Sequence, residues 1–96
     1  MIDEKASQIC IVTVTGQDKV GIVAKLATVM ARVNINIVDI NQKILDQTFV
    51  MTMAVDIAKA AITMDKIKAR LDKAAKELDL RITIQHENIF KAMHRV

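Results

Sequence analysis

The chain of 96 residues contains no proline and only two glycines. It has no tryptophan or tyrosine, a single cysteine, and two phenylalanines, Phe49 and Phe90. A lone cysteine excludes an internal disulfide framework and is typical of a reducing compartment. The scarcity of aromatic side chains argues against RNA recognition by base stacking, because sheet-based RNA-binding modules display aromatics on their central strands.

Long apolar runs and blocks of like charge are also missing. No segment approaches the roughly 20 apolar residues that span a bilayer, and the N-terminal MIDEKASQ is too polar for a secretory signal. The net charge of +3 is small, and basic residues are interleaved with acidic ones, so there is no basic arm. We therefore expect a cytoplasmic protein with no membrane partner and no nucleic-acid partner.

The remaining composition, 52% hydrophobic and 26% charged, is that of a folded globular chain. Its length corresponds to one domain, residues 1–96, which we divide into a core (9–85) and a helical tail (86–96). A nearly continuous run of β-branched and apolar residues predicts a strand over 8–15 that is covered on both faces and therefore central in its sheet. Alternating apolar residues predict strands over 35–45, 48–57 and 80–85. Apolar residues three and four positions apart predict helices over 22–33 and 63–78, the first ending at Asn34 and the second capped by Thr63.

The predicted order is β-α-β-β-α-β followed by a short helical tail. With right-handed crossovers this order gives an α+β, ferredoxin-like sandwich: an antiparallel four-stranded sheet with both helices on one face. One face of the third strand is expected in the core (Phe49, Met51, Met53, Val55). In the second helix the buried stripe includes either Ala74 or Ala75.

Apolar residues also point to the face of the sheet that two helices cannot cover. They come from the first and third strands (Ile9, Ile11, Val50, Ala54). Exposed apolar sheet of this kind marks an interface. We therefore expect a homodimer.

Both glycines lie in TVTGQDKVGIVAK, residues 13–25, at a junction between a strand and a helix. The G-x-x-x-x-G spacing is that of a phosphate-binding loop, but that motif continues with Lys and then Ser or Thr, and here Ile22-Val23 follow. A structural interpretation has Gly16 end the strand and Gly21 allow the helix to pack closely on the sheet. A third interpretation is a small-ligand site, in which helix N-terminal amides attract a carboxylate and Asp18 holds an ammonium group. A zwitterionic amino acid satisfies both requirements.

The pattern strand–G-x-D-[KR]-x-G-[IL]–helix, followed by VNINIV at residues 33–38, resembles the ACT domain, a regulatory module attached to many enzymes of amino-acid metabolism. The resemblance covers Ile9 to Gln85, and Val20 stands where many members have proline. With Asn34, Asn36 and the tail at residues 89–93, the chain is most similar to uncharacterised stand-alone, single-domain ACT proteins of bacteria and archaea. The resemblance implies the βαββαβ fold that the periodicity also predicts.

The resemblance further implies that an amino acid binds between two subunits, at the loop after the first strand and the start of the second. Asp18 would meet the amino group, and the amides of Val20, Gly21 and Ile22 the carboxylate. Asp18 can instead cap the helix, and Asn36, whose amide both donates and accepts, can instead be a turn residue. The implied ligand-binding residues are Gly16, Gln17, Asp18, Lys19, Val20, Gly21 and Ile22 on one side, with Asn36, Ile37 and Asp39 across from them.

Catalytic and metal sites find little support in the sequence. His86 and His94 are eight residues apart, which rotates them about 80° out of alignment on a helix, and Cys10 lies in mid-strand, where an inert buried thiol is expected. We expect no enzyme activity, no metal and no cofactor. The predicted function is a regulatory domain that senses an amino acid or similar metabolite and acts on a partner protein that the sequence does not identify. The alternative is a ligand-free interaction module that uses its sheet face and the Phe90 tail.

Overall fold

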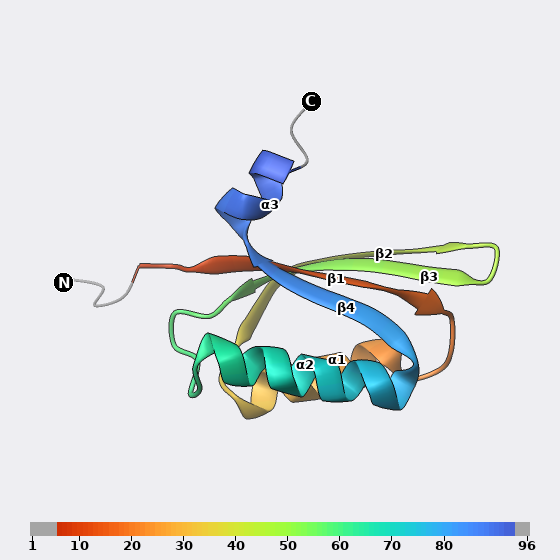
Figure 1. Ribbon diagram of the computed structural model, residues 1–96, viewed down its shortest axis with the longest axis horizontal. Coiled ribbons are helices and arrows are strands. Elements are labelled where there is room, and N and C mark those ends of the chain that lie inside the picture. Colours follow the sequence, from red (N-terminus) through yellow and green to blue (C-terminus); the bar gives the residue numbers. More distant parts are fainter. Residues whose placement is uncertain (1–5, 94–96) are drawn as a thin grey trace.

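The computed structural model describes residues 6–93, which form four strands and three helices (Figure 1). The observed order confirms the predicted one; His94 and Val96 of the predicted tail lie outside the described residues. The elements are β1 (Ile9–Gln17), α1 (Ile22–Arg32), β2 (Asn36–Leu45), β3 (Thr48–Asp56), α2 (Met64–Leu78), β4 (Leu80–His86) and α3 (Glu87–Met93).

The strands form one antiparallel sheet in the order β2-β3-β1-β4. Helices α1 and α2 lie on one face, and the short α3 lies on the other side of the sheet (Figure 1). This is the predicted ferredoxin-like sandwich. Strand β1 is central, as predicted. On its second face the short α3 contacts β1 and β4 but not β2 or β3, so it does not form a second helical layer over the sheet. None of the described helices is long and apolar enough to cross a bilayer.

The core lies between the sheet and the α1–α2 layer. Because side chains alternate along a strand, one face of β3 is buried, and this is the predicted set Phe49, Met51, Met53 and Val55. In α2 the buried alanine is Ala74. The opposite sheet face is only half-buried at Ile9, Ile11, Val50 and Ala54, in keeping with the prediction that the chain's own helices do not cover it.

Strand β2 is an edge strand and is exposed along nearly its whole length. A bulge at Val38 interrupts its pairing with β3. Beyond the bulge, Ile40 and Ile44 stand opposite Met53 and Phe49 on the helix side of the sheet. They are nevertheless 41% and 54% exposed. Four exposed large hydrophobic side chains therefore lie on β2 (Val38, Ile40, Ile44 and Leu45), in addition to the half-buried sheet face.

Candidate functional site

The glycine loop begins later than the sequence suggested, because β1 continues through Gly16 to Gln17. Gly16 pairs with Phe49 on one side and Leu80 on the other, so it does not end the strand. A Cβ atom there would lie 2.6 Å from the Leu80 Cδ2 and 3.3 Å from the Asp79 carbonyl oxygen. A side chain at position 16 would thus crowd the residues at the start of β4.

Gly21 is required for its backbone conformation. It occupies the N-cap position of α1 with φ 93°, a left-handed value that costs an L-residue energy. A Cβ atom at Gly21 would contact nothing within 4 Å, so the expectation that Gly21 allows close helix packing is wrong. The expectation that Asp18 caps α1 is wrong too, since no side chain caps this helix. Asp18 lies before the N-cap position, which Gly21 occupies. Its backbone N–H donates to the Gln47 carbonyl at 2.9 Å.

The loop leaves a short run of amides open at the start of α1. Lys25 N–H reaches the Gly21 carbonyl at 2.9 Å and closes the first helical turn. Within the described residues, the N–H groups of Val20, Gly21 and Ile22 have no hydrogen-bond acceptor. Val20 is fully exposed and the Ile22 side chain is buried. The loop therefore offers backbone donors, with the side chains of Asp18 and Lys19 exposed beside them.

The other predicted half of the site, at the start of β2, is rearranged by the bulge at Val38. Asn36 and Asp39 stand opposite Asp56 and Ala54, on the helix-free side of the sheet. Ile37 stands opposite Val55 and packs against the core, so its side chain cannot reach a ligand. The Asp39 carboxylate accepts from the Ile40 N–H at 2.9 Å. Asn36 is the predicted residue that remains exposed and aimed at a cleft.

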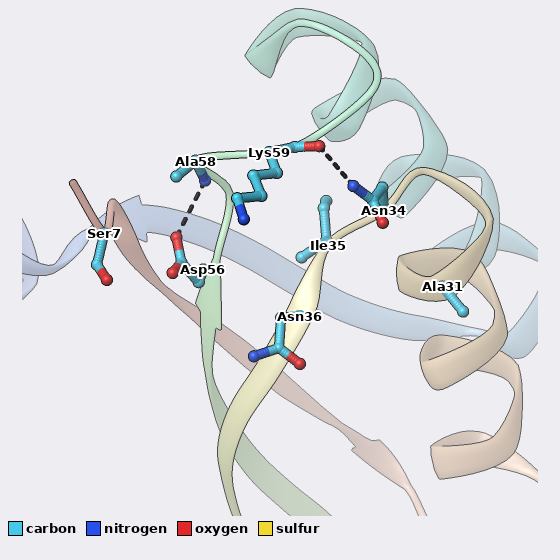
Figure 2. Close-up of a pocket in the computed structure, with 8 residues that line it drawn as sticks. All are labelled: Ser7, Ala31, Asn34, Ile35, Asn36, Asp56, Ala58 and Lys59. Atoms are coloured by element: carbon cyan, nitrogen blue, oxygen red, sulfur yellow. Dashed lines mark hydrogen bonds between the residues drawn. The ribbon is translucent and has the colours of Figure 1, made fainter. Parts of the chain in front are cut away.

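That cleft, of about 500 Å³, lies where α1 leads into β2 and β3 leads towards α2 (Figure 2). The side chains of Asn36, Asp56 and Lys59 surround it, and they provide an amide, a carboxylate and an ammonium group. The sequence had singled out Asn36 alone of these three, because Asp56 and Lys59 belong to no recognisable motif. The lining residues are Ser7, Ala31, Asn34, Ile35, Asn36, Asp56, Ala58 and Lys59.

Hydrogen bonds hold the walls of the cleft in place. Asn34 ends α1 with φ 61°, as predicted, and its side-chain amide donates to the Lys59 carbonyl at 2.9 Å. The Asp56 Oδ1 accepts from the N–H groups of Gln8 and Ala58, each at 3.0 Å. The Ala58 and Gln8 bonds lower the pKa of Asp56, so this carboxylate is ionised at neutral pH.

Within one chain, the loop and the cleft lie at opposite ends of the sheet. Gly16 pairs with Phe49 at one end of the sheet, whereas Ile9 and Asn36 both pair with Asp56 at the other. The nine residues of β1 separate these ends by about 27 Å, at about 3.4 Å per residue. A single amino acid cannot touch both, so one chain by itself does not assemble the predicted site.

Comparison with known proteins shows which family the chain belongs to. The model of the ACT domain family matches residues 8–85. The chain belongs to the ACT domain family. It is 48% identical over 86 residues to a UPF0237 protein of Methanocaldococcus jannaschii, and the match covers 90% of this chain and 96% of that protein.

Two solved structures show where this ACT domain stands among folds. An ACT domain protein from Streptococcus pneumoniae superposes with a TM-score of 0.76 at 31% identity, over 90% of this chain and 97% of that one. A formyltetrahydrofolate deformylase from Pseudomonas syringae gives a TM-score of 0.78 at 19% identity. That match covers 86% of this chain and 28% of the deformylase, and it shows the shared fold alone.

The ACT domain carries few groups suited to catalysis among its described residues. Cys10 is buried, and burial, together with the nearby Glu87 carboxylate, raises the pKa of its thiol. Residues 6–93 contain no cluster of His, Cys, Asp and Glu that could hold a metal ion. The loop and the cleft therefore provide groups for hydrogen bonding and charge pairing.

Replacing Asp56 with Asn tests the charge at the cleft. A carboxylate whose pKa is lowered by folding stabilises the fold above its ordinary pKa of 3.8 and loses this contribution as the pH falls through the lowered value. Asn keeps an oxygen acceptor but has no charge, so Asp56→Asn is expected to be less stable than the wild type near neutral pH. Urea unfolding is expected to show this difference shrinking as the pH falls below 3.8.

Asp46→Asn makes the same change of charge at the β2–β3 turn and serves as the control, since Asn tolerates the left-handed φ of 57° found there. A stability difference for Asp56→Asn that stays constant over the whole pH range would show that its hydrogen bonds do not depend on charge.

Proposed function

We propose that this protein is a homodimeric regulatory domain that binds an amino acid or a similar small zwitterion between its subunits and acts on a partner protein. The observation that supports the proposal is the separation of the loop from the Asn36 cleft. Between these two ends runs the edge strand β2, which has exposed apolar side chains and a free outer edge. In a dimer, a second copy would place its cleft beside the loop of the first copy and its loop beside the cleft of the first.

Antiparallel pairing of two β2 edges would join the two halves of the site. Edge strands present unpaired N–H and C=O groups that readily accept another strand. Around a two-fold axis the second copy runs in the opposite direction, so its Asn36 end lies beside the Leu45 end of the first. Leu45 pairs with Thr48, which also pairs with Gln17 just before the loop. The loop of one subunit then lies near the cleft of the other.

The groups gathered in this way match the two charges of an amino acid. The open amides of Val20, Gly21 and Ile22 at the start of α1 would bind a carboxylate. In the neighbouring cleft, the ionised Asp56 would pair with an ammonium group, a role that the sequence had given to Asp18. Asn36 would donate and accept hydrogen bonds between them. These groups act by hydrogen bonding and charge pairing, which favours binding over catalysis.

Calorimetry with the twenty amino acids and common metabolites tests the proposal. We expect binding of one class of zwitterion at one site per subunit, with about tenfold weaker binding to Asn36→Leu, because one or two hydrogen bonds are lost. Asn88→Leu makes the same substitution on α3, away from the β2 edge, and is expected to bind like the wild type. Folded wild-type protein that binds none of these compounds would overturn the sensing function.

A ligand-free interaction module is the second candidate, and α3 is the observation that favours it. Ile89 and Met93 of this helix are 55% and 63% exposed, a surface that a partner protein could cover. Gly21→Ala separates the candidates, since the strained backbone would displace the loop amides without touching either apolar surface. Loss of effector binding with the dimer intact supports the sensor, and loss of assembly alone supports the module.

A further inference from the structure

The charge of the molecule is concentrated on its helical layer. Helices α1 and α2 carry seven of the lysines and arginines but only three acidic residues. The rest of the chain has one more acid than it has basic residues, although the whole chain is +3. The layer that faces away from the sheet is therefore a positively charged surface on a nearly neutral protein.

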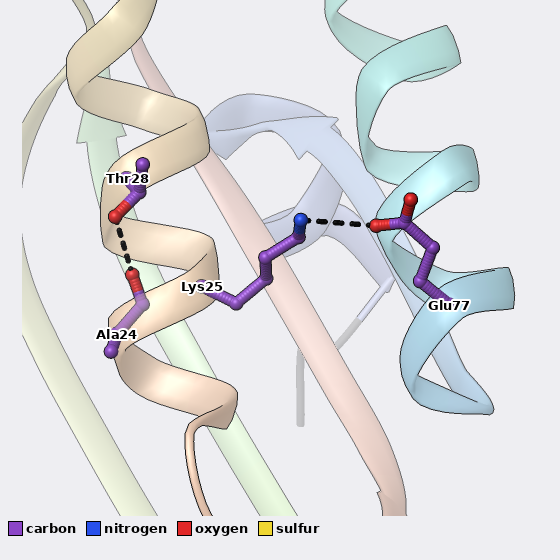
Figure 3. A network of polar contacts seen from close by, with 4 residues as sticks. All are labelled: Ala24, Lys25, Thr28 and Glu77. Carbon is purple, nitrogen blue, oxygen red and sulfur yellow. Dashed lines mark hydrogen bonds and ion pairs between the residues drawn. The ribbon is translucent and has the colours of Figure 1, made fainter.

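A groove of about 100 Å³ runs between these helices. Its lining is Lys25, Val29, Arg32, Arg70, Lys73, Ala74 and Glu77. The helices are antiparallel across it, since Lys25 near the start of α1 binds Glu77 near the end of α2, with Nζ and Oε1 3.0 Å apart (Figure 3). Small and β-branched side chains, Ala74 and Val29, line it between the charged groups.

The two ends of the groove differ in their charge balance. At one end Glu77 neutralises Lys25, whose hydrogen bond and charge lower the pKa of the Glu77 carboxyl. The other end has Arg32 from α1 and Arg70 from α2, with Lys73 one turn along. Lys73 lies between the two ends, because its charge also helps to lower the pKa of Glu77. No other carboxylate lines the groove beside Arg32 and Arg70 within the described residues, and Asp72 lies instead in a hollow on the β4 side of α2. Like charges that converge without a counter-charge repel one another.

We propose that this end of the groove, formed by Arg32, Arg70 and Lys73, binds a phosphate group of a small phosphorylated metabolite. Guanidinium groups match phosphate oxygens with paired donors, and lysine adds a third charge. A hollow of about 100 Å³ has room for about three water-sized groups, at roughly 30 Å³ each, which is enough to seat a phosphate group with the rest of the ligand outside the groove. The site lies between the helices and shares no lining residue with the cleft, although Arg32 directly follows Ala31 of the cleft wall, so it would be a second binding site of the domain.

Titration with inorganic phosphate and pyrophosphate, followed by amide NMR at constant ionic strength, tests this site. We expect shifts centred on Arg32, Arg70, Lys73 and Ala74, with pyrophosphate binding more tightly. Arg70→Gln is expected to weaken binding at least about tenfold, the effect of one lost charge-assisted hydrogen bond. Lys66→Gln removes the same charge from α2 outside the groove and should change the affinity less than twofold.

Equal weakening by both variants, or equal shifts with chloride, would show general charge attraction and overturn the site. A single-stranded RNA oligonucleotide that binds more tightly than pyrophosphate, with shifts spread over the whole α1–α2 face, would also overturn it in favour of a nucleic-acid surface. Arg70 and Lys66 are both exposed, so both variants are expected to fold. Because neither lies near the loop or the cleft, amino-acid binding measured in parallel separates failure of this site from failure of the proposed sensor.

Discussion

Replacing Ile40 with Lys is expected to convert the proposed dimer into folded monomers and to abolish effector binding at the same time. Ile40 is 41% exposed on the unpaired β2 edge, so the single chain can accommodate a lysine there. In a two-fold interface the substitution occurs twice, and because only 41% of Ile40 remains to be buried, each lost isoleucine contact costs about 0.6–1.2 kcal/mol. The lost contacts alone weaken the dimer roughly tenfold to sixtyfold in Kd, and burying two lysine charges adds to this loss. Sedimentation velocity and calorimetry on the same sample measure both effects.

Ile89→Lys is the matched control, because it makes the same substitution at an exposed isoleucine on α3, away from the β2 edge. We expect this variant to remain dimeric and to bind the effector. If Ile89→Lys gives monomers while Ile40→Lys stays dimeric, the interface lies on the α3 side of the sheet, and the shared site at the β2 ends is wrong.

Gly16→Val is expected to cause the largest loss of stability of any single change in the loop region. Its Cβ would lie 2.6 Å from the Leu80 side chain and 3.3 Å from the backbone carbonyl of Asp79. Leu80 can move, but the Asp79 carbonyl belongs to a left-handed residue that ends α2, so it cannot yield without disturbing the helix end. Overpacking of this kind costs about 1–3 kcal/mol. Urea unfolding followed by circular dichroism measures the loss.

Thr15→Val is the control for Gly16→Val, since it places valine one position earlier in β1, on the half-buried face without helices. We expect this change to alter stability by less than about 0.5 kcal/mol, as is usual away from buried features. Equal destabilisation by both variants would mean that β1 rejects valine generally and that the contact with Leu80 is not the cause.

The elements and their core faces could be predicted from the sequence because they depend on local periodicity. The spacing of Leu26, Met30, Ile67 and Leu71 determines which side of each helix is buried, whatever lies opposite. Asn34 could be assigned as the left-handed end of α1 because its side chain tolerates positive φ. Asp18 shows the limit of such reasoning, because a plausible capping residue is displaced when the next glycine, Gly21, takes the N-cap position.

The candidate site depends on pairings between distant segments, which no local pattern contains. Asp56 and Lys59 come close to Asn36 only because β2 and β3 pair in one particular register, and the bulge at Val38 changes which side chains share a face. The same holds for Gly16, whose requirement for glycine comes from Leu80, more than sixty positions later in the chain.

The amino-acid sequence by itself determined the order of strands and helices and the residues of the core, because these follow from short-range patterns of apolar residues, and its glycine motif indicated the ACT domain family. Only the tertiary structure decided that the loop and the Asn36 cleft lie at opposite ends of the sheet, that β2 is an exposed edge strand with apolar side chains, and that Arg32 and Arg70 line one groove. The physical reason is that these features arise from strand register and helix packing, which bring together residues far apart in the chain.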